Sequence, residues 1–186
     1  MISIQPVTGI GEVAFGDDLA VLLGDTLAPL APETGDILVV TQKIISKAEG
    51  RRVDLASVSP GPRAIEIAGA IGKDPRLVEL VLAESTQIVR SAPNVLITRH
   101  RLGFVMANAG IDASNIGSAQ SNSVLLLPLD PDGTAARLRE ALQARFAVGM
   151  GVILSDSFGR PWRNGVTNVA IGSAGLPALL DKRGGP

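Results

Sequence analysis

A cluster of charged and polar side chains follows an apolar run in the sequence GVILSDSFGRPWRNG. Asp156 and Ser157 are expected at the end of a strand, where their oxygen atoms can hold divalent ions on nucleotide phosphates. Arg160 and Arg163 follow, and their planar guanidinium groups match carboxylates and phosphates. The alternative is a long hairpin in which the only tryptophan is a buried anchor and the arginines face solvent.

A second acidic site follows another predicted strand, in the sequence MANAGIDASN. Asp112 and Asn115 are three residues apart, and Ala109 and Gly110 before them permit close approach to the backbone. A carboxylate and an amide at this spacing can both face a hard cation or the phosphate that it carries. The alternative is a capped loop, in which Asp and Asn side chains bond their own backbone.

Two of the chain's four lysines, Lys43 and Lys47, directly follow a predicted buried strand. Ligands of α/β proteins often bind where a strand leaves the edge of the sheet, and lysine binds phosphate as a compact point charge. The alternative is a solvated helix start with ordinary surface lysines. Because acidic side chains follow two further strands, we expect Asp112 and Asp156 to converge and hold the cations of a triphosphate.

Glu84 and His100 are weaker candidates. Glu84 is predicted at a helix C-terminus, where the helix dipole disfavours a carboxylate, and this hints at function. The alternative is a solvated helix end. His100 lies between two arginines in a predicted turn, and we expect it on the surface without a catalytic role.

Composition limits the chemistry. The 186-residue chain has no cysteine and one histidine, which excludes disulfides, thiolate nucleophiles and zinc sites built from cysteine or paired histidines. Any metal is then held mainly by oxygen ligands, as Mg²⁺ and Mn²⁺ are.

The formal net charge of −1 indicates no polyanion-binding surface, so no nucleic-acid partner is expected. The sequence has neither a Walker-type phosphate loop nor a GxGxxG motif after a strand.

The apolar pattern also bears on location. No run approaches the roughly 18 apolar residues of a membrane-spanning helix, and the N-terminus lacks a signal-peptide pattern. We therefore expect a cytoplasmic protein that does not contact a membrane.

Strands and helices do not alternate strictly, which favours one mixed α/β or α+β domain over residues 1–186 and disfavours a doubly wound sheet. The expected helices are 15–30, two pieces within 62–85 that break at 72–75, and 130–147. The expected strands are 2–7, 35–42, 87–90, 94–99, 103–108, 123–129 and 151–156. The chain stops in Gly-Gly-Pro with no final element to cover the preceding strand, so we expect it to be cut short at the C-terminus.

Four stretches together carry a family resemblance: DILVVTQKIISKAEGR, ESTQIVR, GFVMANAGIDASN and ILSDSFGRPWRNGVTNVAIG. In this order and spacing they resemble the coenzyme F-420:L-glutamate ligase family over almost the whole chain. The resemblance implies an unusual mixed-sheet α+β fold and an intertwined homodimer. It also implies that a C-terminal part with another nucleotide-contacting loop is missing, so we expect this chain alone to bind GTP weakly or to be inactive.

The activity implied by the resemblance is a GTP-dependent addition of L-glutamate to the deazaflavin precursor F-420-0, followed by further γ-linked glutamates. The precursor's carboxylate takes the γ-phosphoryl group, and the glutamate amine attacks the acyl phosphate. Two divalent ions, Mg²⁺ or Mn²⁺, are implied, and K⁺ is compatible with the same site. The other readings are a different nucleotide-dependent carboxylate–amine ligase and an inactive truncated nucleotide-binding module.

The matching motifs also imply residue roles. The implied divalent-metal ligands are Asp112, Asp156 and Ser157. The implied nucleotide-contacting residues are Ile10, Gly11, Glu12, Val13, Gln42, Lys43, Lys47 and Asn115. From their chemistry, Arg160 and Arg163 are assigned as catalytic residues that bind the substrate carboxylate or the acyl phosphate.

Overall fold

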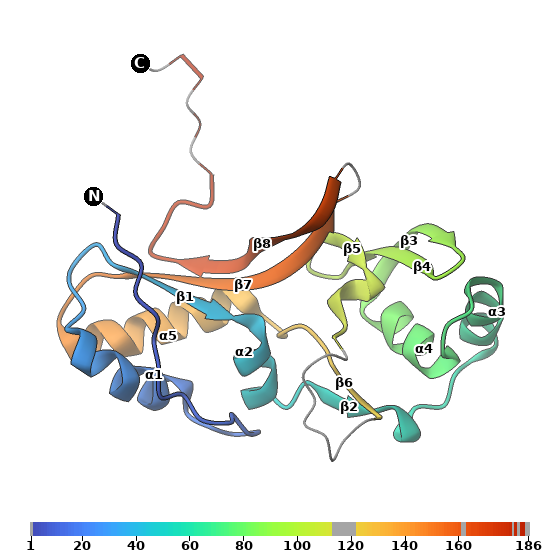
Figure 1. Ribbon diagram of the computed structural model, residues 1–186, viewed down its shortest axis with the longest axis horizontal. Coiled ribbons are helices and arrows are strands. Elements are labelled where there is room, and N and C mark those ends of the chain that lie inside the picture. The colour runs from blue at the N-terminus through green and yellow to red at the C-terminus, as the bar shows by residue number, and fades with distance from the viewer. Residues whose placement is uncertain (1, 113–121, 161–162, 180, 182, 185–186) are drawn as a thin grey trace. The chain divides into compact units, whose positions relative to one another are not determined.

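The chain divides into two compact units in the computed structural model, which describes residues 2–112, 122–160, 163–179, 181 and 183–184 (Figure 1). Unit 1 comprises residues 1–50, 128–156 and 168–186, and unit 2 comprises residues 51–127 and 157–167. Helices combine with parallel and antiparallel strand pairs, which confirms the predicted α+β class. None of the helices in the described ranges is long and apolar enough to span a membrane.

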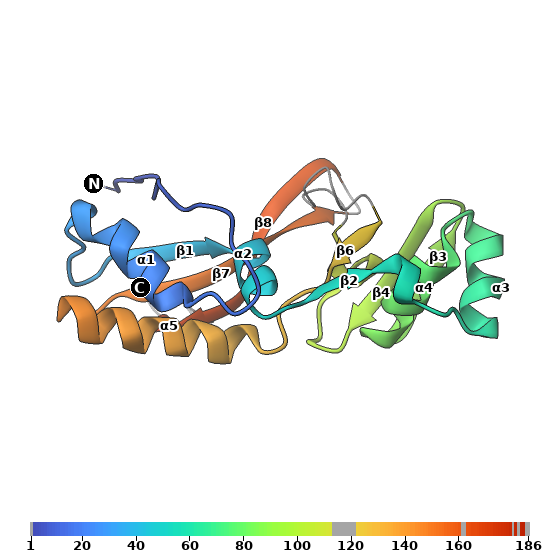
Figure 2. The same cartoon turned by 90° about the horizontal axis from the view of Figure 1, so that it is seen from below.

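Unit 1 is built on a parallel strand pair. β1 (Ile37–Thr41) runs parallel to the first half of β7 (Gly151–Arg160), and β8 (Arg163–Ala174) pairs with the other side of β7. Figures 1 and 2 show α1 (Leu19–Leu27) and α5 (Pro131–Phe146) on the same face of β1 and β7. The remaining elements are η1 (Ala28–Leu30), which follows α1, and α2 (Gln42–Ala48), which follows β1.

Local sequence signals explain where the helices of unit 1 begin. The Asp18 carboxylate accepts hydrogen bonds from the backbone N–H groups of Ala20 and Val21, which caps α1. Asp130 caps α5 in the same way, and Pro131 occupies the first helical position, where no N–H is needed. Both helices were predicted, and both are confirmed.

The core of unit 1 lies between this strand pair and its helices. Its fully or almost fully buried side chains are Leu23, Leu27, Leu38, Val40, Ile45, Leu138, Leu142, Val152 and Leu154. The opposite face of β1 is open in the described chain, since Ile37 is 51% and Val39 is 60% exposed. The predicted strand is confirmed, and it is buried on one face only, because α1 and α5 cover only that face.

Unit 2 contains two antiparallel sheets. β3 (Ser85–Ala92), β4 (Val95–His100) and β5 (Val105–Ala107) form one, in the order β3-β4-β5. The other is the pair of β2 (Arg52–Asp54) and β6 (Ser123–Leu125). The helical elements are η2 (Leu55–Ser57), α3 (Pro62–Ile71), α4 (Pro75–Ala83) and η3 (Asn108–Gly110).

The α3–α4 helix pair packs against the three-stranded sheet of unit 2. Its core consists of Ala64, Ala68, Ile71, Val78, Val81, Leu96 and Ala109. The predicted break between the two helices is confirmed, because Gly72 ends α3 with a φ of 71° and Asp74 caps α4. A positive φ suits glycine, which has no Cβ to collide with the backbone.

One predicted strand and one predicted strand end are wrong. Residues 2–7 form no strand, and Ile2 and Ile4 are 92% and 91% exposed, because an apolar alternation needs a partner edge that local sequence does not supply. Asp156 and Ser157 do not end a strand either. β7 continues through both to Arg160, because pairing with β8 extends beyond the last residue that pairs with β1.

Candidate functional site

Two of the predicted motifs meet at one edge of the unit 1 sheet. Thr41, the last residue of β1, lies opposite Ser155 of β7 in the parallel register. Gln42 and Lys43 follow Thr41, and Asp156 follows Ser155. Because both strands run in the same direction, the two polar segments leave the pairing at the same end, where α/β proteins bind ligands.

Gln42 brings an unused hydrogen-bond donor to this edge. The residue is 1% exposed, and its Oε1 accepts a hydrogen bond from Ser46 Oγ at 2.8 Å. Its buried Nε2 has no partner among the described residues. A buried donor without a partner is costly, so a ligand acceptor such as a phosphate oxygen would relieve that cost.

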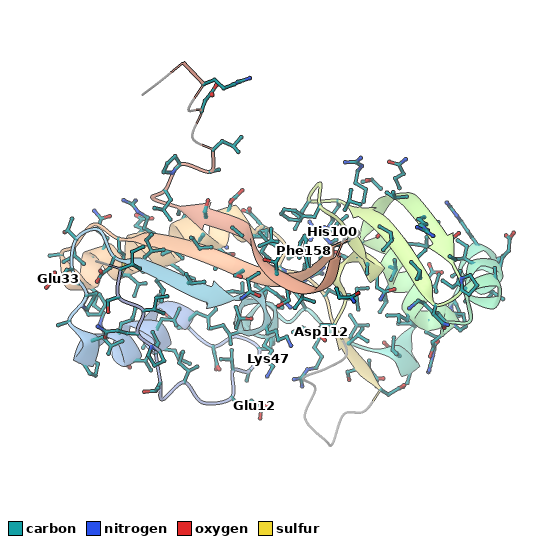
Figure 3. The ribbon with its side chains drawn as sticks, turned by 45° about the horizontal axis from the view of Figure 1, so that its top comes forward. Glu12, Glu33, Lys47, His100, Asp112 and Phe158 are labelled. Atoms are coloured by element: carbon teal, nitrogen blue, oxygen red, sulfur yellow. The ribbon has the colours of Figure 1, made fainter. Side chains whose placement is uncertain are left out.

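The structure also brings the predicted segment of Ile10, Gly11, Glu12 and Val13 beside α2. Lys47 Nζ lies 3.9 Å from Glu12 Oε1 (Figure 3). Val13 is buried and anchors the segment, whereas the side chain of Glu12 is 75% exposed. The two groups of predicted nucleotide contacts in unit 1 are therefore neighbours, although they are some thirty residues apart in the sequence.

The residues of the SDSFGRPWR motif are only partly described. Asp156 is half-buried and Ser157 is exposed. Since consecutive side chains alternate along a strand, these two leave β7 on opposite faces. Arg160 ends β7 and Arg163 begins β8, but their side chains lie outside the described part of the chain.

Asp112 belongs to unit 2 and has a fixed backbone. Its N–H donates to the carbonyl of Leu125 at 3.0 Å, and the Leu125 N–H donates to its carbonyl at 2.8 Å. Its side chain is half-buried. The predicted nucleotide contact Asn115 lies outside the described residues, and the convergence of Asp112 with Asp156 stays a prediction.

The two small residues before Asp112 are closely packed by the protein itself. Ala109 is completely buried in the unit 2 core, and a Cβ on Gly110 would lie 2.6 Å from Met106 Cε. Their size is required by internal packing. The close approach of a ligand to this backbone stays a prediction.

Carboxylates are the candidate metal ligands in this chain, and they suit a hard cation that also binds the phosphates of a substrate. Within the described ranges, no group of three or more His, Cys, Asp or Glu side chains could hold a metal. Mg²⁺ typically binds one or two carboxylates, keeps several waters and takes its other ligands from substrate phosphates. Asp112 in unit 2 and Asp156 in unit 1 are both half-buried carboxylates, and each is a ligand type that such an ion accepts.

A four-residue charge cluster in unit 2 was not predicted. Glu84 Oε1 lies 2.8 Å from Arg51 Nη2, and its Oε2 lies 3.3 Å from His100 Nε2 and 3.1 Å from Arg101 Nε. Arg51 Nη2 and His100 Nε2 have no well-aligned hydrogen bond in the described chain, so their attraction to Glu84 is chiefly electrostatic. The Leu102 N–H donates to His100 Nδ1 at 3.0 Å, which places the proton of the neutral ring on Nε2.

This cluster corrects two expectations. His100 is 0% exposed and ends β4, so its prediction as a surface turn residue is wrong. The Glu84 side chain is only 13% exposed, so it is not a solvated helix end. Burial alone would raise the pKa of Glu84, but contacts from His100, Arg51 and Arg101 outweigh it and lower that pKa to about 2. The cluster joins Arg51, which precedes β2, with Glu84, which caps the end of α4, and His100, which ends β4; this indicates a structural role.

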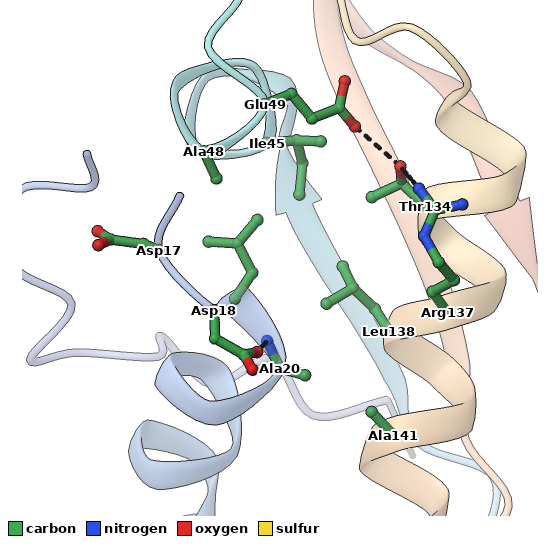
Figure 4. Close-up of a pocket in the computed structure, with 11 residues that line it drawn as sticks. Asp17, Asp18, Ala20, Ile45, Ala48, Glu49, Thr134, Arg137, Leu138 and Ala141 are labelled. Atoms are coloured by element: carbon green, nitrogen blue, oxygen red, sulfur yellow. Dashed lines mark hydrogen bonds between the residues drawn. The ribbon is translucent and has the colours of Figure 1, made fainter. Parts of the chain in front are cut away.

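A pocket of about 390 Å³ lies in unit 1 between the start of α1, α2 and α5 (Figure 4). Its carboxylates already have partners: Asp17 accepts from the backbone of Ala14, Asp18 caps α1, and Glu49 accepts from Thr134 Oγ1. The lining residues include none of the predicted site residues. We therefore place the candidate site at the β1–β7 edge and not in this pocket.

Comparison with known proteins identifies the family. The family model described as F420-0:Gamma-glutamyl ligase matches residues 9–186, which span both units. A relative from Methanopyrus kandleri, named Coenzyme F420:L-glutamate ligase, is 46% identical over 181 residues, which cover 97% of this chain and 69% of the relative. A protein of the same name from Methanothermobacter thermautotrophicus is 42% identical over 185 residues, covering 98% of this chain and 72% of that protein.

The similarity extends to more distant relatives. The protein of that name from Methanocaldococcus jannaschii is 38% identical over 178 residues, covering 96% of this chain and 70% of its own length. The resemblance found in the sequence motifs is thus confirmed along nearly the full chain. The chain belongs to the F420-0:gamma-glutamyl ligase family.

Proposed function

We propose that this protein joins L-glutamate to the deazaflavin precursor F-420-0, with GTP as the source of the activating phosphoryl group, and then adds further γ-linked glutamates. The observation that carries the proposal is the meeting of the Gln42–Lys43 segment and Asp156 at one edge of the β1–β7 pair. Family membership supports the ligation of glutamate. This edge offers the ammonium groups of Lys43 and Lys47 and the carboxylate of Asp156 to a nucleotide.

The proposed reaction has two steps. An oxygen of the precursor's carboxylate attacks the γ-phosphorus of GTP, and the bond from that phosphorus to the β-phosphate oxygen breaks as GDP leaves. The glutamate nitrogen then attacks the acyl carbon, the carbon–oxygen bond to phosphate breaks, and the released phosphate takes up the amine proton. Both steps depend on in-line positioning and on charge neutralisation.

The protein's own groups bind and orient the substrates in this scheme. Lys43 and Lys47 place positive charge next to the nucleotide phosphates, and the buried Nε2 of Gln42 donates to a phosphate or base oxygen. Arg160 and Arg163 bind the precursor's carboxylate and then the acyl phosphate through paired N–H groups. Each of these contacts lowers the repulsion between anionic reactants.

Asp112, Asp156 and Ser157 are the proposed ligands of Mg²⁺ or Mn²⁺. Bound divalent ions would offset the negative charge of the triphosphate and of the transferred phosphoryl group. Mg²⁺ typically binds one or two carboxylates and takes its other ligands from phosphate oxygens and water. This explains why substrate and metal are expected to bind together.

The direct test is incubation of the purified protein with F-420-0, L-glutamate, GTP and Mn²⁺, followed by mass measurement of the deazaflavin product. We expect the mass of one added glutamyl residue, which even slow turnover accumulates over hours. No mass increase would refute the proposed activity. Replacement of GTP by ATP in a parallel reaction tests the nucleotide assignment.

Variants separate the proposed roles. Asp156→Asn should abolish glutamate addition and Mn²⁺-dependent GTP binding, because the amide carries no charge for the cation. Glu140→Gln, on the exposed side of α5, is the matched control and should change neither. Arg163→Ala should raise the KM of the precursor or of glutamate more than the Kd of GTP, and an unchanged KM for both substrates would reject its role.

A further inference from the structure

The segment before Asp112 has an unusual backbone. Asn108, Ala109 and Gly110 are consecutive, and their φ angles are 48°, 52° and 70°. Residues with a side chain visit this left-handed region singly and at a steric cost, because Cβ approaches the following carbonyl. The same turn buries Asn108 Oδ1 without a hydrogen-bond partner among the described residues. Both features are unfavourable, and such strain persists only where surrounding contacts enforce it.

Packing holds the turn from two sides. The Ala109 methyl group is 0% exposed and lies in the core cluster with Ala64, Ala68 and Leu96, so this position needs a Cβ. Gly110 cannot accept one, because an added Cβ would lie 2.6 Å from Met106 Cε and 3.0 Å from the Leu127 side chain. Ala109 is therefore held by the packing of its methyl group, and Gly110 is required because no Cβ fits at its position.

The restraint continues to Asp112. The Ile111 N–H donates to the carbonyl of Asn108 at 3.0 Å and closes the turn. Two backbone hydrogen bonds with Leu125 then fix the backbone of Asp112, which is two residues after Gly110. A continuous path of restrained backbone therefore runs from the core of unit 2 to the backbone of Asp112, from which its carboxylate projects.

We propose that Ala109 and Gly110 are positioning residues, and that their left-handed turn holds the Asp112 carboxylate in the orientation that binds a divalent cation on a nucleotide. The inference rests on the proposed role of Asp112. Residues that orient a metal ligand contribute to affinity without touching the metal, and their loss typically costs about 10- to 100-fold in affinity.

The test is Mn²⁺ binding in the presence of GTP, followed by the electron paramagnetic resonance signal of free Mn²⁺. Gly110→Ala should weaken Mn²⁺ binding at least about tenfold. Gly72→Ala is the matched control, because Gly72 has nearly the same φ, 71°, but only Asn94 Oδ1 at 3.8 Å near its Cβ position. It should lower the Tm by about 2–4 °C and leave Mn²⁺ affinity within about twofold of wild type.

A second variant covers the case in which Gly110→Ala does not fold. Ala109→Gly adds no atoms, and glycine adopts the required φ readily, so the variant should fold but hold the turn less firmly. We expect Mn²⁺ affinity to fall about tenfold here as well. Normal Mn²⁺ binding by Ala109→Gly would overturn the proposal. An equal loss in Gly72→Ala would also overturn it, because the effect would then be general destabilisation.

Asp112→Asn distinguishes failure of this inference from failure of the proposed site. If Asp112→Asn abolishes Mn²⁺ binding while both turn variants bind normally, Asp112 is a ligand and the turn does not position it. If Asp112→Asn binds Mn²⁺ like wild type, the metal assignment itself is wrong and the inference falls with it.

Discussion

Replacement of Glu84 by glutamine should reveal how much the buried charge cluster of unit 2 stabilises the fold. Glutamine keeps the size of the side chain but removes the charge that faces Arg51 and Arg101. Glu84 is only 13% exposed, and Arg51 is 15% exposed, so water can compensate little of the loss. The variant leaves buried positive charge without its partner.

The magnitude follows from the pKa of Glu84, which falls from its ordinary 4.5 to about 2. Each pKa unit corresponds to about 1.36 kcal/mol, so the ionised carboxylate contributes roughly 3 kcal/mol to the free energy of unfolding at neutral pH. Because the folded-state pKa is the lower one, this contribution is complete above about pH 5 and is lost as the pH falls towards 2. Linkage leaves less than half of it at pH 3.

Urea denaturation of wild type and Glu84→Gln at pH 7, 5, 4 and 3 measures this contribution as a difference. The difference should be about 3 kcal/mol at pH 7 and less than half of that at pH 3. Glu66→Gln, on the exposed face of α3 in the same unit, is the control and should stay within about 0.5 kcal/mol of wild type at every pH. A difference for Glu84→Gln that does not vary with pH would refute the assigned role of its charge.

Three further predictions test local features of unit 1, with one control substitution in β7. Asp18→Ala removes the cap of α1 and should lower the free energy of unfolding by about 1 kcal/mol in urea titrations. Gly172→Ala should lower it by about 1–3 kcal/mol, since the new Cβ would lie 2.5 Å from the Pro131 carbonyl carbon, whereas Gly159→Ala meets no atom within 4 Å and should be neutral. Ala147→Gly should raise the Tm by about 2 °C, because this exposed residue ends α5 with a φ of 57°, and an unchanged or lower Tm would contradict that account.

The helices were predictable because their signals are local. Asp18 and Asp130 precede apolar periodicity, and the Gly72–Pro75 break separates α3 from α4 as the sequence indicates. Strand limits depend on pairing partners that are distant in the sequence. Residues 2–7 alternate like a strand yet remain unpaired, and β7 passes Asp156 because β8 pairs with its outer half.

The candidate site was predictable by residue type more than by environment. Lys47 lies beside Glu12 in unit 1, and the nucleotide contacts assigned to Glu12, Gln42 and Lys47 stay predictions. The Glu84–His100 contact could not be foreseen, since the two residues are sixteen positions apart and their charges carry no periodic signal. A histidine between two arginines is typical of a surface turn, and only the strand register places it inside.

The turn before Asp112 shows why a sequence of small residues does not indicate an open backbone. Ala109 and Ala147 both have positive φ angles, yet only at the exposed Ala147 is glycine expected to raise the Tm. At Ala147 the methyl group contacts solvent, so its removal relieves strain at little cost. At Ala109 the same methyl group is packed in the core and holds a strained turn in place. Glycine there would relieve the backbone strain but would also release the restraint on the turn. In Ala109→Gly the Mn²⁺ affinity should therefore fall by an amount that the change in stability does not set.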